Sequence, residues 1–385
     1  MKSYDAAIAG GGIIGVSCAL ALAEAGLRVG VFDRQEPGRE ASWAAAGMLS
    51  PAPHLSGDGP LVPLARESLQ LYPEFILAIE SASQKRTNYG QKGALELFFG
   101  ADAPQERDRH VSLCQSLGLT VEAISATEAR RREPSVASTT RAAAFFPGEA
   151  TIEPRALMDA AIEAARVCGV EVHANCPVQS LVIQGSRCSG IVTGGQQISA
   201  DHVVIAAGCF SREVLEEGSY CAERLTPFLP TRPVRGQMLA LLPRDTTLAR
   251  AVRSSRGYLV PRSNGWIVAG STLEESGFDK HTTVEGLQKI RKTAVELIPD
   301  LASAEIVESW CGLRPGTPDG LPILGPIDVE GVILATGHFR NGILLAAVTA
   351  QLVKDWITHA RPSIPVETFS PLRFVRSTAE AQPAI

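Results

Sequence analysis

Residues 4–33 read YDAAIAGGGIIGVSCALALAEAGLRVGVFD, and this stretch contains the most informative pattern in the chain. It predicts, in order, a buried strand (Tyr4–Ala9), a G-x-G-x-x-G turn (Gly10–Gly15), a helix from about Ile13 to Ala25, and a second strand (Leu27–Phe32) that ends in Asp33. A strand, a glycine turn, a helix and a second strand in this order are typical of the dinucleotide-binding unit of a doubly wound α/β sheet.

The residues of this pattern each have a physical role in binding a dinucleotide. Gly10 allows the tight turn, Gly12 lets the backbone approach a pyrophosphate, and Gly15 lets the helix and the strand pack closely. The N-terminus of the helix offers free N–H groups and a partial positive charge to phosphates. Asp33 can accept hydrogen bonds from ribose hydroxyls. The pattern alone does not separate FAD from NAD, and a plain Gly-rich turn is the alternative to a nucleotide site.

The composition is that of an ordinary globular protein. The chain has 385 residues, 45% hydrophobic and 20% charged, and its length predicts two to three domains. Its 35 glycines and 25 prolines are too few for a disordered chain. The formal net charge is −5, and the basic run Arg130–Arg132 is flanked by Glu128 and Glu133. We therefore expect a solvated helix end at this run and no nucleic acid partner.

The cysteine and histidine patterns favour a cytoplasmic protein without a metal site. The eight cysteines include no C-x-x-C pair, which favours reduced thiols, and the seven histidines show no metal-binding spacing. Residues 6–23 are uncharged and mostly apolar, and they have the length of a signal peptide or a membrane span. Three consecutive glycines in that stretch are unfavourable in a continuous helix, so we expect no stable membrane association.

Six stretches of the sequence carry a resemblance to a known family. They are the Gly10–Gly15 fingerprint, ASWAAAGM (Ala41–Met48), PVRGQ (Pro233–Gln237), YLVPR (Tyr258–Arg262), GLRPGTPDG (Gly312–Gly320) and GHFRNGILL (Gly337–Leu345). In these stretches, which together span nearly the whole chain, the sequence resembles the glycine oxidases of the D-amino acid oxidase family of FAD enzymes. The last two stretches are particularly typical of glycine oxidases within that family.

The resemblance implies an α/β fold with two interleaved domains. A Rossmann-like FAD-binding domain of the GR2 type would comprise residues 1–82, 147–222 and 309–372. An α+β substrate domain, built on an antiparallel sheet, would comprise residues 83–146 and 223–308, and residues 373–385 would form a C-terminal tail.

Local signals along the chain agree with this layout. Proline at a first helical position, glycine after a helix and asparagine before one mark helix ends, and Asn264-Gly265 marks a hairpin turn. The predicted helices run from Pro154 to about Cys168, near Ser211–Glu217, from Glu285 to Leu297, and from Asn341, as N-cap, to about Ile357.

The resemblance also implies which residues bind FAD. At the run of small residues after Ala41 the backbone could pass close to a flat ring system. A simple Ala-rich helix turn would show the same sequence pattern. The helix that follows Arg340 would point its N-terminus at the flavin pyrimidine, and Val178 would contact the adenine side through its backbone. The expected cofactor residues are Gly10, Gly12, Ile13, Ile14, Gly15, Asp33, Arg34, Ala41, Ser42, Ala46, Gly47, Met48, Val178, Gly208, His338, Phe339, Arg340, Asn341, Gly342, Ile343 and Leu344.

A carboxylate substrate needs a cation, and Arg314 in its Gly/Pro-rich turn is the best candidate. A guanidinium can hold a carboxylate through two parallel hydrogen bonds, whereas an arginine in a loop is by default a solvated surface charge. By resemblance, Tyr258 would add its hydroxyl to the same carboxylate, and Arg340 would contact substrate or flavin. These three are the expected catalytic residues, and Met48 and Arg256 would also line the substrate pocket.

The predicted reaction is the oxidation of glycine, with sarcosine and small D-amino acids as further substrates. Glycine, O2 and water would give glyoxylate, ammonia and H2O2 through an imine, and the family role would be to supply the thiazole part of thiamine. Hydride transfer from the substrate to the flavin needs a neutral amine and correct geometry, so the lack of an evident acid–base pair agrees with this prediction.

Two alternatives remain open at this point. One is a D-amino acid or sarcosine dehydrogenase that passes electrons to a carrier. The other is a flavin-holding subunit without turnover. Cys311 is expected to be a buried, inert thiol, although related sarcosine oxidases bond their flavin covalently at a nearby cysteine. Self-association into a dimer or tetramer is a weaker expectation taken from related enzymes.

Overall fold

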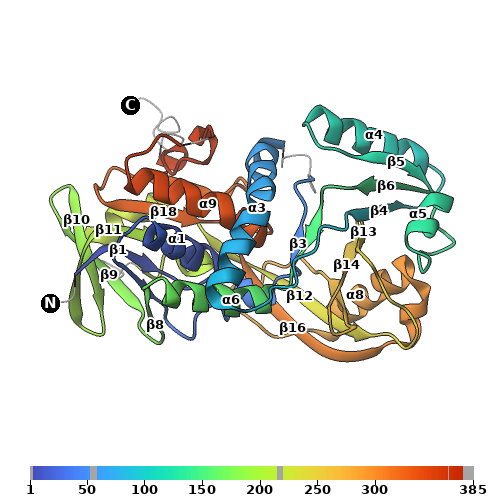
Figure 1. Ribbon diagram of the computed structural model, residues 1–385, viewed down its shortest axis with the longest axis horizontal. Coiled ribbons are helices and arrows are strands. Elements are labelled where there is room, and N and C mark those ends of the chain that lie inside the picture. The colour runs from blue at the N-terminus through green and yellow to red at the C-terminus, as the bar shows by residue number, and fades with distance from the viewer. Residues whose placement is uncertain (1–2, 53–58, 215–219, 363, 376–385) are drawn as a thin grey trace, which may run out of the picture.

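The computed structural model describes residues 3–52, 59–214, 220–362 and 364–375, and it contains two large β-sheets that lie side by side (Figure 1). The first sheet carries the N-terminal strand and the helices α1 and α9. The second sheet carries α4, α5 and α8 at the other end of the molecule. This confirms the predicted combination of a parallel, Rossmann-like sheet with a largely antiparallel one.

The first sheet joins strands from distant parts of the sequence. Its order is β17-β18-β11-β1-β2-β8, with β10 pairing β11 and β9 pairing β10. The neighbours β18, β11, β1, β2 and β8 are parallel, whereas β17, β10 and β9 pair antiparallel. The strands are β1 Ser3–Ala9, β2 Val29–Phe32, β8 Glu171–His173, β9 Val178–Gln184, β10 Arg187–Thr193, β11 Gln196–Ile205, β17 Ile323–Pro326 and β18 Val332–Thr336.

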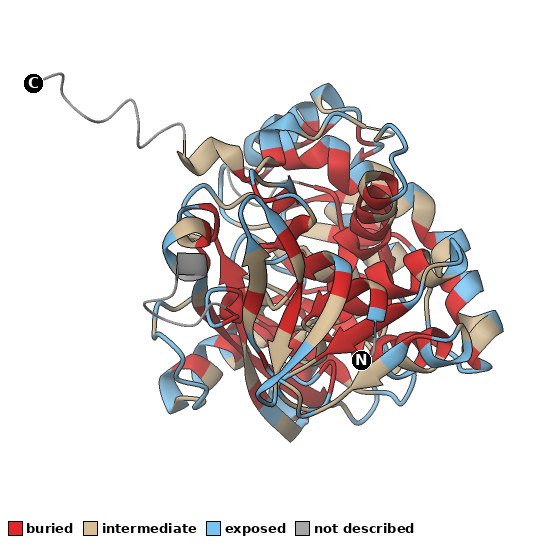
Figure 2. Ribbon diagram, turned by 90° about the vertical axis from the view of Figure 1, so that its left-hand side faces the viewer, coloured by how far each residue is buried: buried red, intermediate tan, exposed pale blue. Residues whose placement is uncertain are grey.

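Four helices pack together on one face of this sheet. They are α1 (Ile13–Glu24), α3 (Val62–Ser83), α6 (Pro154–Val167) and α9 (Gly342–Ile357). α1 is rich in alanine and leucine and is buried along most of its length, because α9 and α6 pack against it. α3 is tied to the start of α9 by the buried hydroxyl of Tyr72, which donates to the Ile343 carbonyl at 2.6 Å. Figure 2 shows that the buried residues concentrate on these strands and on the inward faces of the helices.

The second sheet has the order β16-β12-β15-β14-β13-β4-β6-β5. Its neighbours are antiparallel except for β13 and β4, which are parallel. The strands are β4 Ala94–Phe98, β5 Glu122–Ser125, β6 Ala142–Phe146, β12 Arg232–Leu242, β13 Ala251–Ser254, β14 Gly257–Pro261, β15 Ile267–Gly270 and β16 Glu305–Gly316. The helices of this part are α4 Ala103–Ser116, α5 Ala126–Arg132 and α8 Val284–Leu297.

The long strands β12 and β16 connect the two parts of the molecule. They pair from Arg232 opposite Gly316 to Leu242 opposite Glu305, and α2 (Ala41–Ala44) packs on β16. A Cβ atom on Gly312 of β16 would lie 2.5 Å from the Ala44 side chain, so glycine is needed for this approach. The division into two domains stays a prediction, and its boundary at residue 309 falls inside β16.

The remaining elements are short. They are β3 Met48–Leu49, β7 Ala150–Thr151, α7 Tyr220–Leu225 and the 3-10 turns Gly59–Leu61, Gly208–Phe210, Thr226–Phe228, Pro299–Ser303 and Glu367–Phe369. β3 pairs antiparallel with β7.

One local prediction is wrong over the residues that the structure describes. Residues 211–214 of the helix expected near Ser211–Glu217 form a turn, in which the Ser211 hydroxyl donates to the Gly208 carbonyl at 2.7 Å, and residues 215–219 lie outside the described part. Asn341 is the N-cap residue of α9, as predicted, although its side chain makes no capping hydrogen bond. The tail from residue 376 onward also lies outside the described residues.

Gly15→Ala is expected to destabilise the first sheet. A Cβ atom there would lie 1.9 Å from the Gly10 carbonyl oxygen, so the helix and the turn would have to separate. We expect the free energy of unfolding to fall by about 1–3 kcal/mol, measured by urea denaturation. Gly90→Ala is the matched control, because a Cβ atom there meets nothing within 4 Å. Equal stability of the two variants would contradict the close approach of Gly10 and Gly15.

Candidate active site

A large cavity lies where the parallel strands of the first sheet end. The residues that follow β1, β2 and β11 all line it, together with Thr336 at the end of β18. In open α/β sheets, ligands bind at this carboxyl edge of the strands. The empty space, including the open mouth, is about 1770 Å³. Strands β12, β14 and β16 of the second sheet close the cavity from the other side.

The glycine turn after β1 shapes one end of the cavity. Gly10 has φ = +110°, and a Cβ atom on it would lie 2.6 Å from the Ala206 carbonyl oxygen. Gly12 faces open space, because a Cβ atom there would meet only the Ser42 hydroxyl within 4 Å. That hydroxyl accepts a hydrogen bond from the Ile13 amide at 3.0 Å. The backbone at Gly12 is therefore accessible to a phosphate at the N-terminus of α1.

Asp33, at the end of β2, is placed beside this turn. Its carboxylate accepts hydrogen bonds from the Gly11 amide at 2.7 Å and from the Gln35 amide at 2.9 Å. Burial raises the pKa of Asp33, and these two backbone donors act in the opposite direction. The side chain is thus fixed at the cavity wall, where a ribose would be recognised through its hydroxyls.

The loop before α9 forms the opposite wall. Phe339 has φ = +47°, and its amide donates to the Pro315 carbonyl at 3.0 Å, which anchors the loop to the end of β16. Residues 338–343 line the cavity. The first amide groups of a helix have no intrahelical partner, so α9 offers donors and a partial positive charge to this region.

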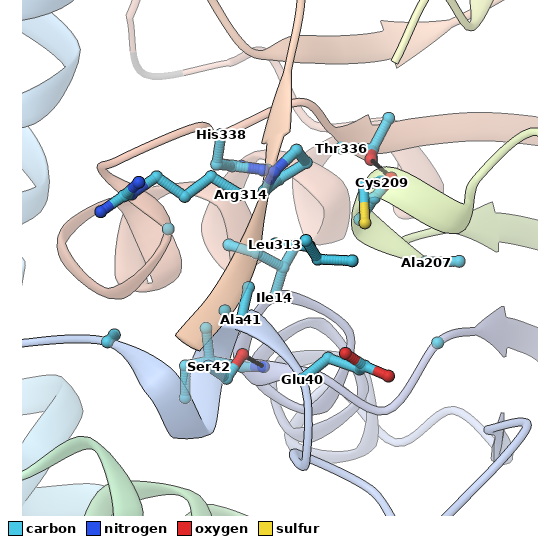
Figure 3. Close-up of a pocket in the computed structure, with 18 of the residues that line it drawn as sticks. Ile14, Glu40, Ala41, Ser42, Ala207, Cys209, Leu313, Arg314, Thr336 and His338 are labelled. Atoms are coloured by element: carbon cyan, nitrogen blue, oxygen red, sulfur yellow. Dashed lines mark hydrogen bonds between the residues drawn. The ribbon is translucent and has the colours of Figure 1, made fainter. Parts of the chain in front are cut away.

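Arg314 is the cation on the second-sheet side of the cavity. Its guanidinium donates to the Ser271 hydroxyl at 2.7 Å and to the Thr272 carbonyl at 3.2 Å. Burial lowers the pKa of Arg314 from its ordinary value. Glycine is required at position 236 on the neighbouring strand, because a Cβ atom there would lie 2.2 Å from the guanidinium nitrogens. Figure 3 shows Arg314 and His338 at one end of the cavity and Glu40 and Ser42 at the other.

Tyr258 on β14 lies beside Arg314 in the cavity wall. Its hydroxyl donates weakly to the Met238 sulfur at 3.5 Å. A Cβ atom on Gly270 would lie 2.7 Å from that hydroxyl, so a second glycine makes room for this side chain. The cavity therefore presents a phenol from β14 and a guanidinium from β16, two strands of the same sheet.

The imidazole of His338 is buried in the wall. Its side chain is 3% exposed, and its Nε2 atom lies 3.1 Å from the Thr349 hydroxyl. Burial lowers the pKa of His338 to about 3, so the ring is neutral at pH 7.

Comparison with known proteins settles the family. Residues 5–356 match the DAO family model, which is described as FAD dependent oxidoreductase. The chain belongs to this family. Glycine oxidase from Pseudomonas aeruginosa is 33% identical over 368 residues, covering 94% of this chain and 97% of that protein. The bifunctional protein ThiO/ThiG from Synechocystis sp. is 34% identical over 381 residues, covering 97% of this chain and 54% of that protein.

A solved structure agrees with this assignment. The crystal structure of glycine oxidase from Geobacillus kaustophilus matches with a TM-score of 0.90 and 31% identity, over 97% of this chain and 99% of that chain. Membership of the DAO family confirms the predictions of FAD as cofactor, of an oxidoreductase and of a Rossmann-like fold.

The cavity of this FAD dependent oxidoreductase fits a dinucleotide with a flat ring. Gly12 and Gly208 both line the cavity. A Cβ atom would lie 3.2 Å from the Ser42 hydroxyl at Gly12 and would meet nothing within 4 Å at Gly208. Both helix N-termini, of α1 and α9, open into the same space. The residues from Gly10 to Ile14 with Asp33 would hold the pyrophosphate and a ribose, and the loop before α9 would hold the flavin ring.

Most of the residues expected from the sequence line this cavity. On the cofactor side they are Gly10, Gly12, Ile13, Ile14, Asp33, Arg34, Ala41, Ser42, Ala46, Gly47, Met48, Val178, Gly208 and His338–Ile343, and on the substrate side Tyr258, Arg314 and Arg340. Arg314 lies on the strand β16 rather than in the expected turn. Its Gly/Pro-rich neighbours are compatible with a strand because β16 is the edge of the second sheet.

Three expected site residues do not line the cavity. Gly15 packs against the Gly10 carbonyl, and Leu344, in the first turn of α9, is buried in the hydrophobic core. Arg256 was expected in the substrate pocket, but it is exposed on the turn between β13 and β14 and pairs with Glu296 of α8 at 2.8 Å. The turn directs its side chain toward the helix and away from the cavity, so this expectation is wrong.

Cys311 does not line the cavity in the described structure. It is half-buried rather than buried, and its thiol donates to the Lys280 carbonyl at 2.7 Å. The three residues that follow Cys311 in the strand, Gly312, Leu313 and Arg314, do line the cavity.

Several cavity residues were missed from the sequence. Gly236 and Gly312 belong to stretches that signalled the family, so their positions could have been inferred. Glu40, Phe210 and Glu213 carry no local signal, because only the tertiary fold brings the turn after β11 beside the segment after β2. The Arg34 guanidinium lies 3.3 Å from the centre of the Phe210 ring.

The buried, neutral His338 should make stability depend on pH. The unfolded chain takes up a proton at this residue below about pH 6.5, whereas the folded protein does so only at about pH 3. The stabilising contribution is therefore present above pH 6.5 and is lost as the pH falls toward 3, by up to about 1.4 kcal/mol per pH unit. In His338→Gln this contribution should be absent.

Urea denaturation at a series of pH values from about 7.5 to 5 measures this contribution of His338 to the free energy of unfolding. The difference in unfolding free energy between wild type and His338→Gln should shift by about 1–2 kcal/mol across this range. His359→Gln, at an exposed position just after α9, is the control and should follow the wild type. Parallel pH curves for wild type and His338→Gln would show that the imidazole is not held neutral.

Proposed function

We propose that this protein catalyses the oxidative deamination of glycine. Glycine, O2 and water would give glyoxylate, ammonia and H2O2 through the imine, with sarcosine and small D-amino acids as further substrates. Full-length similarity to glycine oxidases supports this choice. The observation that carries it is the position of Arg314, a cation built into the wall of the cavity that would hold FAD.

Arg314 is suited to a small carboxylate substrate. Its guanidinium donates hydrogen bonds to Ser271 and Thr272, and it fits in this place because residue 236 is glycine. Charge-assisted hydrogen bonds of this kind contribute about 1.5–3 kcal/mol each. Tyr258 would donate its hydroxyl to the same carboxylate, and Arg340 at the mouth would add a second positive charge. This arrangement would orient the substrate by its carboxylate and leave its amine-bearing carbon free to face the flavin.

The remaining titratable groups of the cavity would not exchange protons with the substrate. The carboxylates that line it are Asp33, Glu40 and Glu213, which belong to the end near α1, and His338 is already bonded to Thr349. FAD, when bound, supplies the acceptor for two electrons and the site of reaction with O2. The N-terminus of α9 would favour negative charge on the ring by about 0.3–2 kcal/mol. Catalysis would therefore rest on orientation and electrostatics.

The role in metabolism is proposed from a relative. The similarity to a ThiO/ThiG protein supports the supply of the oxidised amine for the thiazole part of thiamine. A cytoplasmic location and self-association into a dimer or tetramer are parts of the same proposal. No helix in the described part of the chain is long and apolar enough to cross a membrane.

Two alternatives make different predictions. A D-amino acid or sarcosine dehydrogenase would reduce its flavin with substrate and pass the electrons to a carrier instead of O2. A non-catalytic flavin-holding subunit would show no reduction by substrate at all. The guanidinium beside Tyr258 argues against the subunit, because a carboxylate clamp has no use in it.

Anaerobic mixing of the FAD-loaded protein with glycine, sarcosine, D-alanine and D-proline tests the proposal. Loss of flavin absorbance near 450 nm, fastest with glycine or sarcosine, is the expected result. Admitting air should then restore the absorbance and release H2O2. Reduction without rapid reoxidation would favour the dehydrogenase, and failure of all four amines to reduce the flavin would contradict the proposal.

Arg314→Met should remove substrate binding without removing FAD. We expect kcat/KM for glycine to fall by about 100-fold or more, since at least one charge-assisted bond pair of about 3 kcal/mol is lost. Flavin content and the flavin spectrum should stay close to those of the wild type. Arg256→Met is the matched control, because Arg256 pairs with Glu296 outside the cavity. A wild-type rate of flavin reduction in Arg314→Met would show that the carboxylate binds elsewhere.

A further inference from the structure

The PVRGQ stretch on β12 contains two buried polar side chains that the proposed reaction does not use. Arg235 is 7% exposed and Gln237 is 0% exposed. Between them lies Gly236, which makes room for Arg314. Both side chains point to the segment that joins β15 to α8, residues 271–283, which we call the strap.

Arg235 holds the middle of the strap. Its Nε atom donates to the Glu274 carboxylate at 2.6 Å, and its Nη1 atom donates to Asp279 at 2.5 Å and to the His281 carbonyl at 3.1 Å. The backbones of Arg235 and Glu274 also exchange two hydrogen bonds, at 2.8 and 3.0 Å. One guanidinium therefore bonds to three positions along the strap.

Gln237 holds both ends of the strap. Its backbone amide donates to the Thr272 hydroxyl at 2.9 Å. Its side-chain oxygen accepts from the Thr283 amide at 2.7 Å, and its side-chain nitrogen donates to the Thr283 hydroxyl at 3.0 Å and to Glu274 at 2.8 Å. Every polar atom of this buried amide has a partner in the strap.

The first two residues of the strap hold the guanidinium of Arg314, the expected substrate-binding group. Ser271 and Thr272 supply the hydroxyl and the carbonyl to which the Arg314 guanidinium donates. A shift of the strap would therefore move both acceptors, and the geometry of a bidentate carboxylate contact depends on where the guanidinium is held.

The middle of the strap covers the opposite end of the cavity. Lys280 donates to Glu40 at 2.7 Å, and the Phe278 ring stacks on Phe210 with centroids 5.1 Å apart. Glu40 and Phe210 both line the cavity at the end where Arg34 lies. Phe278 is 50% exposed, so its outer face is open to solvent while its inner face contacts a cavity residue. Cys311 adds a further link by donating to the Lys280 carbonyl.

We propose that Arg235 and Gln237 are positioning residues that fix the strap, and that the strap supports both carboxylate binding at Arg314 and retention of FAD. The substrate half of this proposal rests on the proposed function, whereas the FAD half does not. Loss of Arg235 leaves Glu274 and Asp279 without their shared cation and leaves Gln237 alone to hold the strap, so its contacts with Arg314 and with Glu40 and Phe210 would loosen.

The test uses two binding measurements that need no turnover. The dissociation constant of FAD is measured on the apoprotein by flavin fluorescence. The dissociation constant of glycolate, a carboxylate without an amine, is measured on the FAD-loaded protein by the change in flavin absorbance. Arg235→Gln should weaken both on the order of tenfold, which corresponds to about 1.4 kcal/mol each.

Variants at the two contacts should separate the effects. Ser271→Ala should weaken glycolate alone, and the double variant Phe278→Ala/Lys280→Ala should weaken FAD alone. Arg235→Lys keeps the charge but cannot reach Glu274, Asp279 and the His281 carbonyl together, so it should lie between wild type and Arg235→Gln in both measurements. If Arg235→Gln does not fold, Arg235→Lys and Glu274→Gln should still weaken both ligands.

Arg132→Gln is the matched control. Arg132, like Arg235, is an ion-paired arginine, but it lies on α5, away from the cavity. It should leave both dissociation constants unchanged. Dissociation constants for both ligands within twofold of wild type in the folded Arg235 variants would overturn the proposal. Absence of a glycolate signal in the wild type would count against the proposed function, and the FAD measurement would still decide the cofactor half of the strap proposal.

Discussion

The pairing of β12 with β16 is the interaction on which the rest of this structure depends. These strands belong to the second sheet, yet their ends reach the carboxyl edge of the first sheet, where Gly312 packs on α2. The same ladder places Arg314 over the cavity and puts Gly236 across from its guanidinium. Without this ladder, the dinucleotide end and the carboxylate end would belong to separate surfaces.

The two ends of the cavity differ in charge, and this follows from which sheet supplies them. The first sheet contributes Asp33 beside the glycine turn, and Glu40 and Glu213 lie nearby, each paired with Arg34. The second sheet contributes Arg314, and the loop before α9 contributes Arg340. A ligand with hydroxyls at one end and a substrate with a carboxylate at the other would each meet a complementary group. The buried His338, at the same end of the cavity as Arg314, adds no charge at neutral pH.

The sequence predicted the parts of the site whose signals are local. The glycine turn and Asp33 belong to one strand–turn–helix–strand unit, so their spacing predicted a site there, and Gly10, Gly12 and Asp33 do line the cavity. The loop before α9 was expected from the resemblance. Arg256 and Leu344 were misplaced because the direction of a side chain on a turn or a helix depends on tertiary packing. Phe210, Glu40 and the strap could not be found from spacing, since their neighbours are far away in the sequence. The resemblance to a family located Arg314, and only the fold shows that it lies on a strand.

The position of the Arg314 guanidinium depends on the glycine at position 236. A guanidinium can occupy its place only while residue 236 lacks a side chain, since a Cβ atom there would lie 2.2 Å away. During divergence, a lineage that gave up carboxylate substrates would be free to fill position 236, and refilling it would bar the arginine from returning. The two positions therefore form one structural requirement, because a side chain at position 236 and a guanidinium in this place exclude each other.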